Sequence, residues 1–234
     1  MNNLIQFKNV SKEYSLGEKK FLAVDQINFT IDEGEFVVIL GPSGAGKSTV
    51  LNLLGGMDFA TSGEIIINEK NITHYKDEKL TEYRAENVGF VFQFYNLIPT
   101  LTALENVTLT KEVSKNSLDA AEVLTSVGLD DHFNKFPSQL SGGEQQRVSI
   151  ARAVCKNPTM LLCDEPTGAL DSETGVVILS MLQQMSREKN KTVIIVTHNS
   201  ALAQAADKVI RIKNGKVRDI TVNEAPQLVS EVNW

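Results

Sequence analysis

The chain has little cysteine, no long apolar run and no excess of positive charge. Its two cysteines, Cys155 and Cys163, fit neither a zinc site nor a disulfide framework, so we expect two buried, small apolar side chains. The strongest apolar runs, 36–40 and 193–196, are strand-sized, whereas a membrane-spanning helix needs about 20 apolar residues. With 23 basic and 29 acidic residues, a broadly basic nucleic-acid-binding surface is not expected. Because residues 1–8 lack the pattern of a secretory signal, the sequence predicts a cytosolic location.

The pattern of apolar residues indicates two kinds of strand. The length of 234 residues predicts one domain, or a core with one inserted subdomain. Short strands bounded by turn residues, which suggest an antiparallel edge sheet, occupy 4–10, 24–31 and 63–68. Continuous aliphatic and β-branched runs, typical of parallel strands buried on both faces, occupy 35–40, 159–163 and 192–197.

Helical patterns separate the parallel runs and place the chain in the α/β class. These patterns occupy 47–54, 117–127, 144–154 and 172–189. Parallel-strand character disappears between Phe94 and Asn157, so a helical insertion is expected there. We therefore predict a single domain, 1–234, in which the parts are a core at 1–93 plus 158–220, a helical subdomain at 94–157 and a C-terminal tail at 221–234.

A glycine-rich segment follows the first buried run and precedes the first helical pattern. It matches G-x-x-x-x-G-K-[ST] and consists of Gly41, Pro42, Ser43, Gly44, Ala45, Gly46, Lys47, Ser48 and Thr49. Such a loop turns backbone N–H groups toward phosphate oxygens, and the following helix adds the positive end of its dipole. We expect Lys47 to contact the β and γ phosphates and Ser48 to ligate Mg²⁺. The segment therefore predicts a nucleoside triphosphate site.

Two adjacent carboxylates, Asp164 and Glu165, follow the apolar run at 159–163. A phosphate loop needs a carboxylate to hold its metal ion, and Asp164 is expected to supply it. Glu165 would lie near the γ phosphate and orient or deprotonate water, which makes it the candidate catalytic base. The alternative for Glu165 is an ordinary surface carboxylate. Ligands bind at the carboxyl ends of strands in α/β proteins, so its position favours the catalytic role.

A third motif, LSGGEQQR at 140–147, resembles the signature of the ABC ATPases. The positions that match this family, in its order, are Tyr14, 41–49, Gln93, 140–147, Asp164 and Glu165, 169–171 and His198. The resemblance implies a RecA-like P-loop NTPase core with an antiparallel β edge subdomain and an inserted α-helical signature subdomain. It also implies that ATP and Mg²⁺ are the ligands and that ATP hydrolysis is the reaction.

The same resemblance implies an ATP site shared between two copies of the chain. The residues that would bind the γ phosphate of ATP held by the second copy are Ser141, Gly142, Gly143 and Glu144. Glu144 stands where the family most often has Gln, and Cys163 occupies an apolar position of the strand before Asp164. Asp171 would contact the partner chain across the dimer, with a helix-capping role as the alternative.

Three further positions receive roles from the resemblance. Gln93 would contact Mg²⁺ and the attacking water, and His198 would hydrogen-bond the γ phosphate, so that both join Lys47 and Glu165 in the catalytic group. Tyr14 would stack on adenine, and the alternative is a tyrosine packed in the fold. His74 and His132 have no comparable context and receive no role.

The uncharged stretch at 88–104 is expected to begin as a strand and then to become irregular. In the family it lines the groove that receives a coupling helix of a membrane permease, and core packing is the alternative. The sequences at 55–58, 61–63 and 92–99 look most like the MacB/LolD/FtsE branch, whose permeases have few membrane helices and large extracytoplasmic domains.

We therefore predict an ATP-hydrolysing ABC transporter subunit that dimerises around two ATP molecules and drives a separate MacB/FtsX-like permease. The permease would dock near 90–104 and hold the chain at the cytoplasmic face of the membrane, and its cargo and the direction of transport stay open. The alternative is a soluble ABC ATPase acting on ribosomes or DNA. Such proteins usually carry two ATPase units, a coiled coil or a basic extension, and none of these is visible here.

Overall fold

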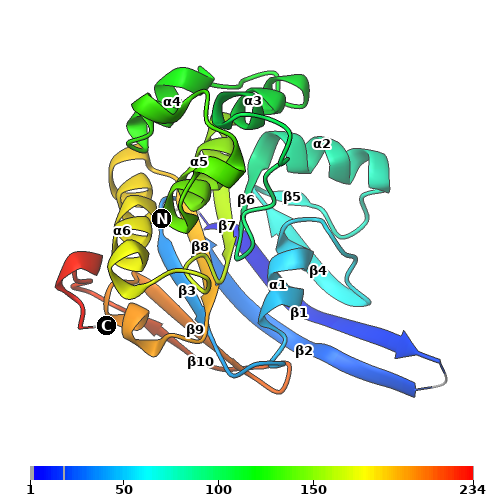
Figure 1. Ribbon diagram of the computed structural model, residues 1–234. Coiled ribbons are helices and arrows are strands. Elements are labelled where there is room, and N and C mark those ends of the chain that lie inside the picture. Colours follow the sequence, from blue (N-terminus) through cyan, green and yellow to red (C-terminus); the bar gives the residue numbers. More distant parts are fainter. Residues whose placement is uncertain (1–2, 18, 234) are drawn as a thin grey trace.

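The first strands form a long antiparallel hairpin at one edge of the molecule. The computed structural model describes residues 3–17 and 19–233 (Figure 1). The four-stranded antiparallel sheet, in the order β2-β1-β4-β5, comprises β1 (Asn3–Leu16), β2 (Lys19–Asp32), β4 (Ser62–Ile67) and β5 (Lys70–Asn71). The expected antiparallel edge sheet is therefore confirmed. The hairpin extends beyond the predicted strands because β1 and β2 satisfy each other's backbone hydrogen bonds out to their shared turn.

The second sheet holds the predicted parallel strands. Its order is β10-β9-β3-β8-β7-β6, and its members are β3 (Phe36–Leu40), β6 (Val88–Phe92), β7 (Met160–Asp164), β8 (Thr192–Thr197), β9 (Lys208–Lys213) and β10 (Lys216–Val222). Every residue of β3 and β8 is buried, which matches their unbroken apolar runs. The sequence patterns missed β9 and β10. The turn between them is Asn214-Gly215 with positive φ at both residues, a hairpin signal that the sequence carries.

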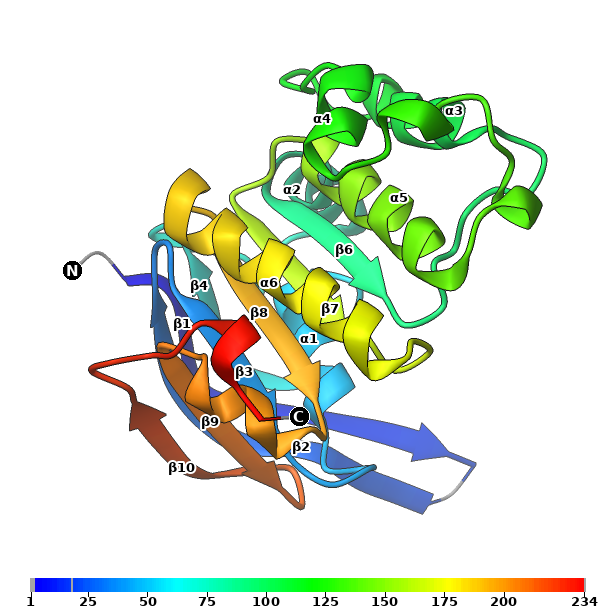
Figure 2. The same ribbon diagram turned by 60° about the vertical axis from the view of Figure 1, so that its left-hand side comes forward.

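Helices cover both faces of the parallel sheet (Figure 2). They are α1 (Lys47–Leu54), α2 (Asp77–Asn87), α3 (Ala103–Thr108), α4 (Ala120–Ser126), α5 (Gly142–Cys155) and α6 (Ser172–Lys189). Alternate residues of β3 point to opposite faces: Val37 and Ile39 pack with α1 and the antiparallel sheet, whereas Phe36 and Val38 pack with α6. No helix within the described chain is long and apolar enough to cross a membrane.

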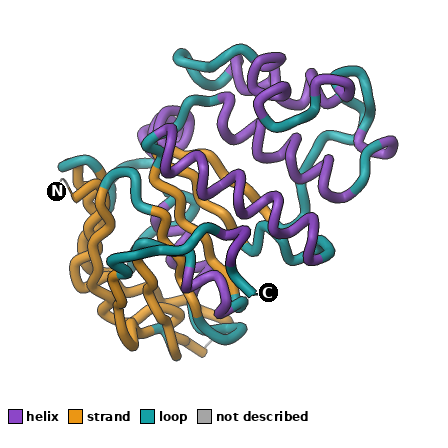
Figure 3. The backbone as a smooth tube through the Cα atoms, turned by 90° about the vertical axis from the view of Figure 1, so that its left-hand side faces the viewer, coloured by secondary structure: helices purple, strands orange, loops and turns teal. Residues whose placement is uncertain are grey.

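The segment between β6 and β7 is helical, and it stands apart from the strands in Figure 3. Helices α3, α4 and α5 share their own apolar cluster, which includes Val107, Leu124 and Val148. Cys155 belongs to this cluster and Cys163 to the core beneath α6, and both are buried and free, as expected. The division into subdomains at 93/94 and 157/158 stays a prediction.

The C-terminal segment differs from the expected tail at 221–234. It begins inside β10 and returns to α6, where Val229 and Val232 are buried in the core. The buried Gln183 side chain of α6 donates a hydrogen bond to the Gln227 carbonyl (2.9 Å) and accepts one from the Val229 N–H (3.0 Å). The few apolar residues of this stretch, among them Leu228, Val229 and Val232, lie among polar residues without a clear period, so only the tertiary contact reveals this packing. Trp234 lies outside the described residues.

Candidate functional site

The glycine-rich loop joins β3 to α1 and is held by the strands behind it. Gly44 and Gly46 have φ of +74° and +100°, a region that glycine adopts without strain. A Cβ on Gly41 would lie 2.3 Å from the Ile212 carbonyl oxygen, and one on Gly46 would lie 2.4 Å from that of Ala23. The spacing of the glycines is therefore required by close backbone approach to β9 and β2.

The N-terminus of α1 presents backbone donors and a cation, and the described residues of its own first turn supply no anion that would compete for them. Within the described chain no side chain caps this helix, and its first turn holds no acidic residue. Lys47 is buried, and its Nζ donates hydrogen bonds to the carbonyls of Gly41 (2.9 Å) and Pro42 (3.0 Å). The loop is thus already folded around the ammonium group. An anion that enters it would meet free N–H groups and a positive charge.

The first carboxylate, Asp164 at the end of β7, faces the start of α1. Its Oδ1 accepts a hydrogen bond from Ser48 Oγ (3.3 Å). Burial raises the pKa of Asp164, and the neighbouring Glu165 raises it further, against the lowering effects of Ser48 and Lys47. A bound cation would relieve this cost. No cluster of three or more metal-binding His, Cys, Asp or Glu side chains occurs among the described residues, so a metal here would depend on the Asp164 carboxylate, the Ser48 hydroxyl, the Gln93 amide expected from the sequence and the ligand's own oxygens. That combination suits Mg²⁺ bound with a polyphosphate.

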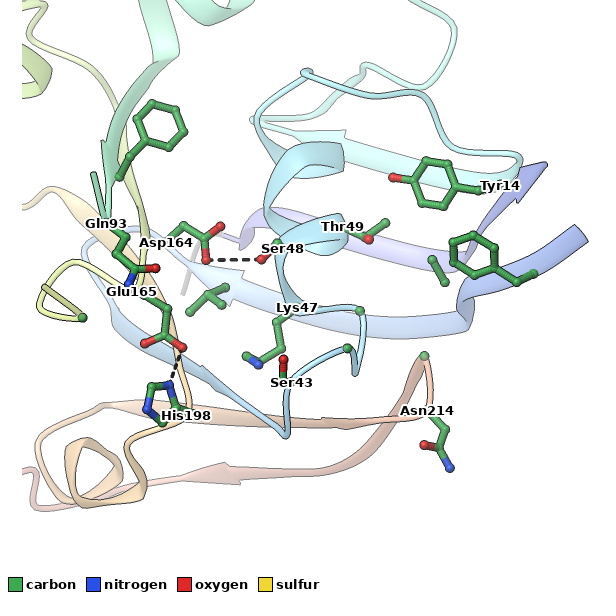
Figure 4. A pocket seen from close by; sticks show the side chains of 18 of the residues that line it. Tyr14, Ser43, Lys47, Ser48, Thr49, Gln93, Asp164, Glu165, His198 and Asn214 are labelled. Carbon is green, nitrogen blue, oxygen red and sulfur yellow. Dashed lines mark hydrogen bonds and ion pairs between the residues drawn. The ribbon is translucent and has the colours of Figure 1, made fainter. Parts of the chain in front are cut away.

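The second carboxylate, Glu165, is fixed by the neighbouring strand β8 (Figure 4). Its two oxygens engage Thr197 Oγ1 (2.9 Å) and His198 Nδ1 (2.8 Å), and its N–H donates to the Val196 carbonyl (2.9 Å). The His198 side chain is 74% exposed, so the pair lies at the mouth of the cavity. Parallel strands end at the same edge of the sheet, and this brings together two residues that lie 33 positions apart.

A cavity of about 1090 Å³ gathers most of the expected site residues. Those that line it are Tyr14, Ser43, Gly44, Gly46, Lys47, Ser48, Thr49, Gln93, Asp164, Glu165 and His198. Gly41, Pro42 and Ala45 shape the loop without lining the cavity. Gln93 follows β6, and its side chain packs against Gly168. A Cβ on Gly168 would lie 2.8 Å from Gln93 Nε2.

The structure also adds lining residues that the sequence patterns missed. Phe21 on β2 lies opposite Tyr14 on β1, and Asn214 and Gly215 form the β9–β10 turn. Phe21 could have been found from the register of the hairpin, because residues that pair across two strands share one face.

The signature residues do not reach this cavity within one chain. Ser141 is the N-cap of α5 and accepts a hydrogen bond from the Glu144 N–H (3.3 Å), while Glu144 Oε2 accepts one from the Ser141 N–H (2.6 Å). Glu144 Oε1 lies 2.8 Å from His132 Nε2. The two signature residues between Ser141 and Glu144, Gly142 and Gly143, lie in the first turn of α5. Binding of a phosphate by these residues in a second copy stays a prediction.

Asp171 is the N-cap of α6. Its side chain accepts hydrogen bonds from the Thr174 N–H (2.9 Å) and from Thr174 Oγ1 (2.8 Å). These bonds hold the pKa of Asp171 below its ordinary value. The capping alternative is therefore present in the structure, and the contact with a partner chain stays a prediction.

Comparison with known proteins gives a consistent result. The family model described as ABC transporter matches residues 24–168. An uncharacterized ABC transporter ATP-binding protein of Methanocaldococcus jannaschii, MJ0796, is 46% identical over 223 residues, which cover 92% of this chain and 95% of the relative. One from Mycobacterium tuberculosis is 44% identical over 219 residues, with 92% and 88% covered.

Solved structures extend this similarity to the fold. MJ0796, solved as a dimer in a post-hydrolysis state with ADP and Pi, matches with a TM-score of 0.86 and 43% identity, over 94% of this chain and 99% of that one. The cbiO1 protein of Clostridium perfringens, part of the ABC transporter complex cbiONQ, matches with a TM-score of 0.85 and 28% identity, over 95% and 89%.

Proposed function

Since the chain belongs to the ABC transporter ATP-binding proteins, we propose that it binds and hydrolyses ATP as the motor subunit of a transporter. The observation that carries this proposal is the cavity in which the phosphate loop, two carboxylates and a histidine converge from four elements. Lys47 and the N–H groups of the loop and of α1 would hold the β and γ phosphates. Mg²⁺, held by Ser48, Asp164 and Gln93, would neutralise charge on the phosphate oxygens.

The catalytic residues would act on a water molecule beside the γ phosphate. Glu165 would take a proton from this water as its oxygen attacks phosphorus, and the bond from phosphorus to ADP would break. Gln93 would orient the water. His198 would hydrogen-bond the γ phosphate, and its contact with Glu165 links the two groups.

We propose further that two chains complete each site, with the α5 N-terminus of one facing the ATP of the other. Ser141 is exposed, Gly142 and Glu144 are half-buried, and none of them lines the cavity of its own chain, which supports this arrangement, as does the dimeric form of MJ0796. A mixing experiment tests it. Lys47→Ala removes the phosphate contact of one copy, and Ser141→Ala weakens the signature of the other.

A 1:1 mixture of the two variants contains heterodimers in which one site combines both defects and the other site is intact. Its ATPase rate should therefore exceed the mean of the rates of the separate variants. Equal rates, with heterodimers demonstrated by cross-linking, would contradict a site shared between chains. Wild type alone, assayed at rising protein concentration, is the control. Its specific activity should rise as dimers form.

A membrane permease of the MacB/FtsX type is the proposed partner, which would hold the chain at the cytoplasmic face of the membrane. The family supports a permease in general, and the exposed apolar residues Phe94 and Ile98 near 90–104 support the docking place. Efflux, lipoprotein or antimicrobial-peptide handling, or force transmission to the cell wall would be the processes driven.

Two matched variants test the docking place. Ile98→Asp places a charge on the expected surface, and Ile220→Asp places the same charge on β10, with side chains 41% and 42% exposed. Affinity capture from membranes should recover a permease with wild type and Ile220→Asp, and much less with Ile98→Asp. Recovery of ribosomal or nucleic-acid material in place of a permease would favour the soluble alternative.

A further inference from the structure

An aromatic pair and an ion pair lie together beside the cavity, on the β1–β2 hairpin. Tyr14 pairs across the hairpin with Phe21, and their ring centroids are 5.5 Å apart at an interplanar angle of 33°. Both side chains line the cavity, and Figure 4 shows Tyr14 at the opposite end from Glu165. The two rings form an apolar wall at the end of the cavity away from Glu165. Aromatic faces of this kind suit the stacking of a flat base.

The Tyr14 ring is held from a second element. Its Oη donates a hydrogen bond to Asp58 Oδ2 (2.6 Å), in the segment after α1, 44 positions away. Lys12 lies two residues before Tyr14 on β1, and both side chains reach Asp58, so they share one face of the sheet. Its Nζ forms an ion pair with Asp58 Oδ1 and donates a hydrogen bond to the Phe59 carbonyl (2.8 Å). The same Nζ lies 4.8 Å from the Tyr14 ring centroid, within cation–π range.

Asp58 is half-buried and both of its carboxylate oxygens accept hydrogen bonds, so it can hold the Tyr14 ring in one position. The Phe59 N–H donates to Asp58 Oδ1 (2.7 Å), in addition to the bonds from Lys12 and Tyr14. Although burial opposes the shift, these hydrogen bonds lower the pKa of Asp58, which stays an ionised acceptor at neutral pH. Burial, together with Asp58, raises the pKa of Tyr14, so its hydroxyl stays a donor.

We propose that Lys12 and Asp58 are positioning residues that hold Tyr14, together with Phe21, as a preformed aromatic platform for the base of a nucleotide in the cavity. The proposal rests on the proposed ATP site. A tyrosine on an exposed hairpin otherwise has several rotamers, and one rotamer must be selected when the base binds. If the Tyr14 rotamer is fixed before the base binds, this entropy is not lost on binding. The affinity for the nucleotide should then be about three- to tenfold higher per side chain fixed.

The test separates the base from the phosphates by comparing ATP with inorganic triphosphate, which lacks a base. Dissociation constants are measured for wild type, Tyr14→Ala, Asp58→Ala and the double variant. We expect Asp58→Ala to weaken ATP binding about three- to tenfold and to change triphosphate binding less than about twofold. It should add nothing in the Tyr14→Ala background, because Asp58 acts through the ring.

Conservative and matched variants keep the result interpretable. Asp58→Asn retains an acceptor for Tyr14 Oη and should recover part of the affinity, and it also replaces Asp58→Ala if that variant does not fold. Asp219→Ala removes an ion pair with Arg211 (2.7 Å) from the β9–β10 hairpin and should leave both affinities unchanged.

Three results would overturn the proposal: equal loss for ATP and triphosphate, additive losses in the double variant, or an unchanged ATP affinity in Tyr14→Ala. A wild-type chain that binds neither ligand would instead contradict the ATP site itself. The two failures are thereby distinguished.

Discussion

Replacing Glu165 by Gln should separate nucleotide binding from hydrolysis. The amide retains an oxygen that can accept the hydrogen bond from Thr197, and it keeps the size of the side chain at a residue whose φ is +47°. What is lost is the basic oxygen that would receive the proton of the attacking water. The fold and the phosphate loop should be unaffected.

The expected magnitude follows from the surroundings of Glu165. General-base catalysis contributes about 10²- to 10⁴-fold, so the barrier to hydrolysis should rise by about 3–5 kcal/mol. The lost pair with His198 is solvent-exposed, since the histidine side chain is 74% exposed, and such pairs contribute at most about 1 kcal/mol to stability. Turnover should therefore fall far more than stability.

The assay combines phosphate release, equilibrium ATP binding and light scattering. Glu165→Gln should bind ATP within a few-fold of wild type, release phosphate at least about 100 times more slowly, and accumulate an ATP-bound dimer. Glu82→Gln, the same chemical change on the exposed surface of α2, is the control and should match wild type. A phosphate-release rate within threefold of wild type would refute the assignment of Glu165 as the base.

Substitutions at three further positions, Gly46, Glu144 and Asp171, probe the loop and the helix caps. Gly46→Ala should lower the free energy of unfolding by more than about 1 kcal/mol, because φ is +100° and a backbone carbonyl blocks the new methyl group. Gly17→Ala, at φ +62° with no described atom within 4 Å, should cost less in the same denaturant titration. The Ser141 backbone hydrogen bond lowers the pKa of Glu144. Its carboxylate therefore contributes fully to stability above the ordinary Glu pKa of about 4.3, and the contribution is lost as pH falls through the lower folded-state value. Glu144→Gln should flatten this part of the pH–stability curve, and a curve unchanged from wild type would contradict the argument. Asp171→Ala should lower the denaturation midpoint through loss of the two hydrogen bonds to Thr174, and Asp171→Asn should restore it, because Asn is an equally good N-cap residue. ATPase activity that stays low in Asp171→Asn would indicate the partner contact.

The sequence predicted the elements in which the pattern is local. Strands β3, β7 and β8 are buried on both faces, so an unbroken apolar run marks each of them. Helices α1 and α6 begin and end at the predicted residues, because a glycine-rich turn precedes one and Asp171 caps the other. The loop at 41–49 and the two carboxylates were recognisable for the same reason: their chemistry needs particular residues at fixed short spacing.

Elements stabilised by distant partners escaped the sequence patterns. Helix α2 buries only Leu80 and Tyr83, which is too little for a periodic signal. Strand β9 begins with Lys208, which is buried because it pairs with Glu35 Oε2 (2.8 Å), 173 positions away. A lysine at that position predicts an exposed side chain, and only the distant partner Glu35 explains why Lys208 is buried.

The sequence by itself therefore determined the α/β class, the glycine-rich loop and the candidate catalytic motifs, since each pattern depends on neighbours within a few residues. The tertiary structure decided which distant groups meet. It joins Glu165 to His198 across adjacent strands, it places Asp58 against Tyr14, and it leaves the signature outside the cavity of its own chain. Such pairings depend on strand order and on the register of the hairpin, and these are set by packing of the whole chain rather than by local preference.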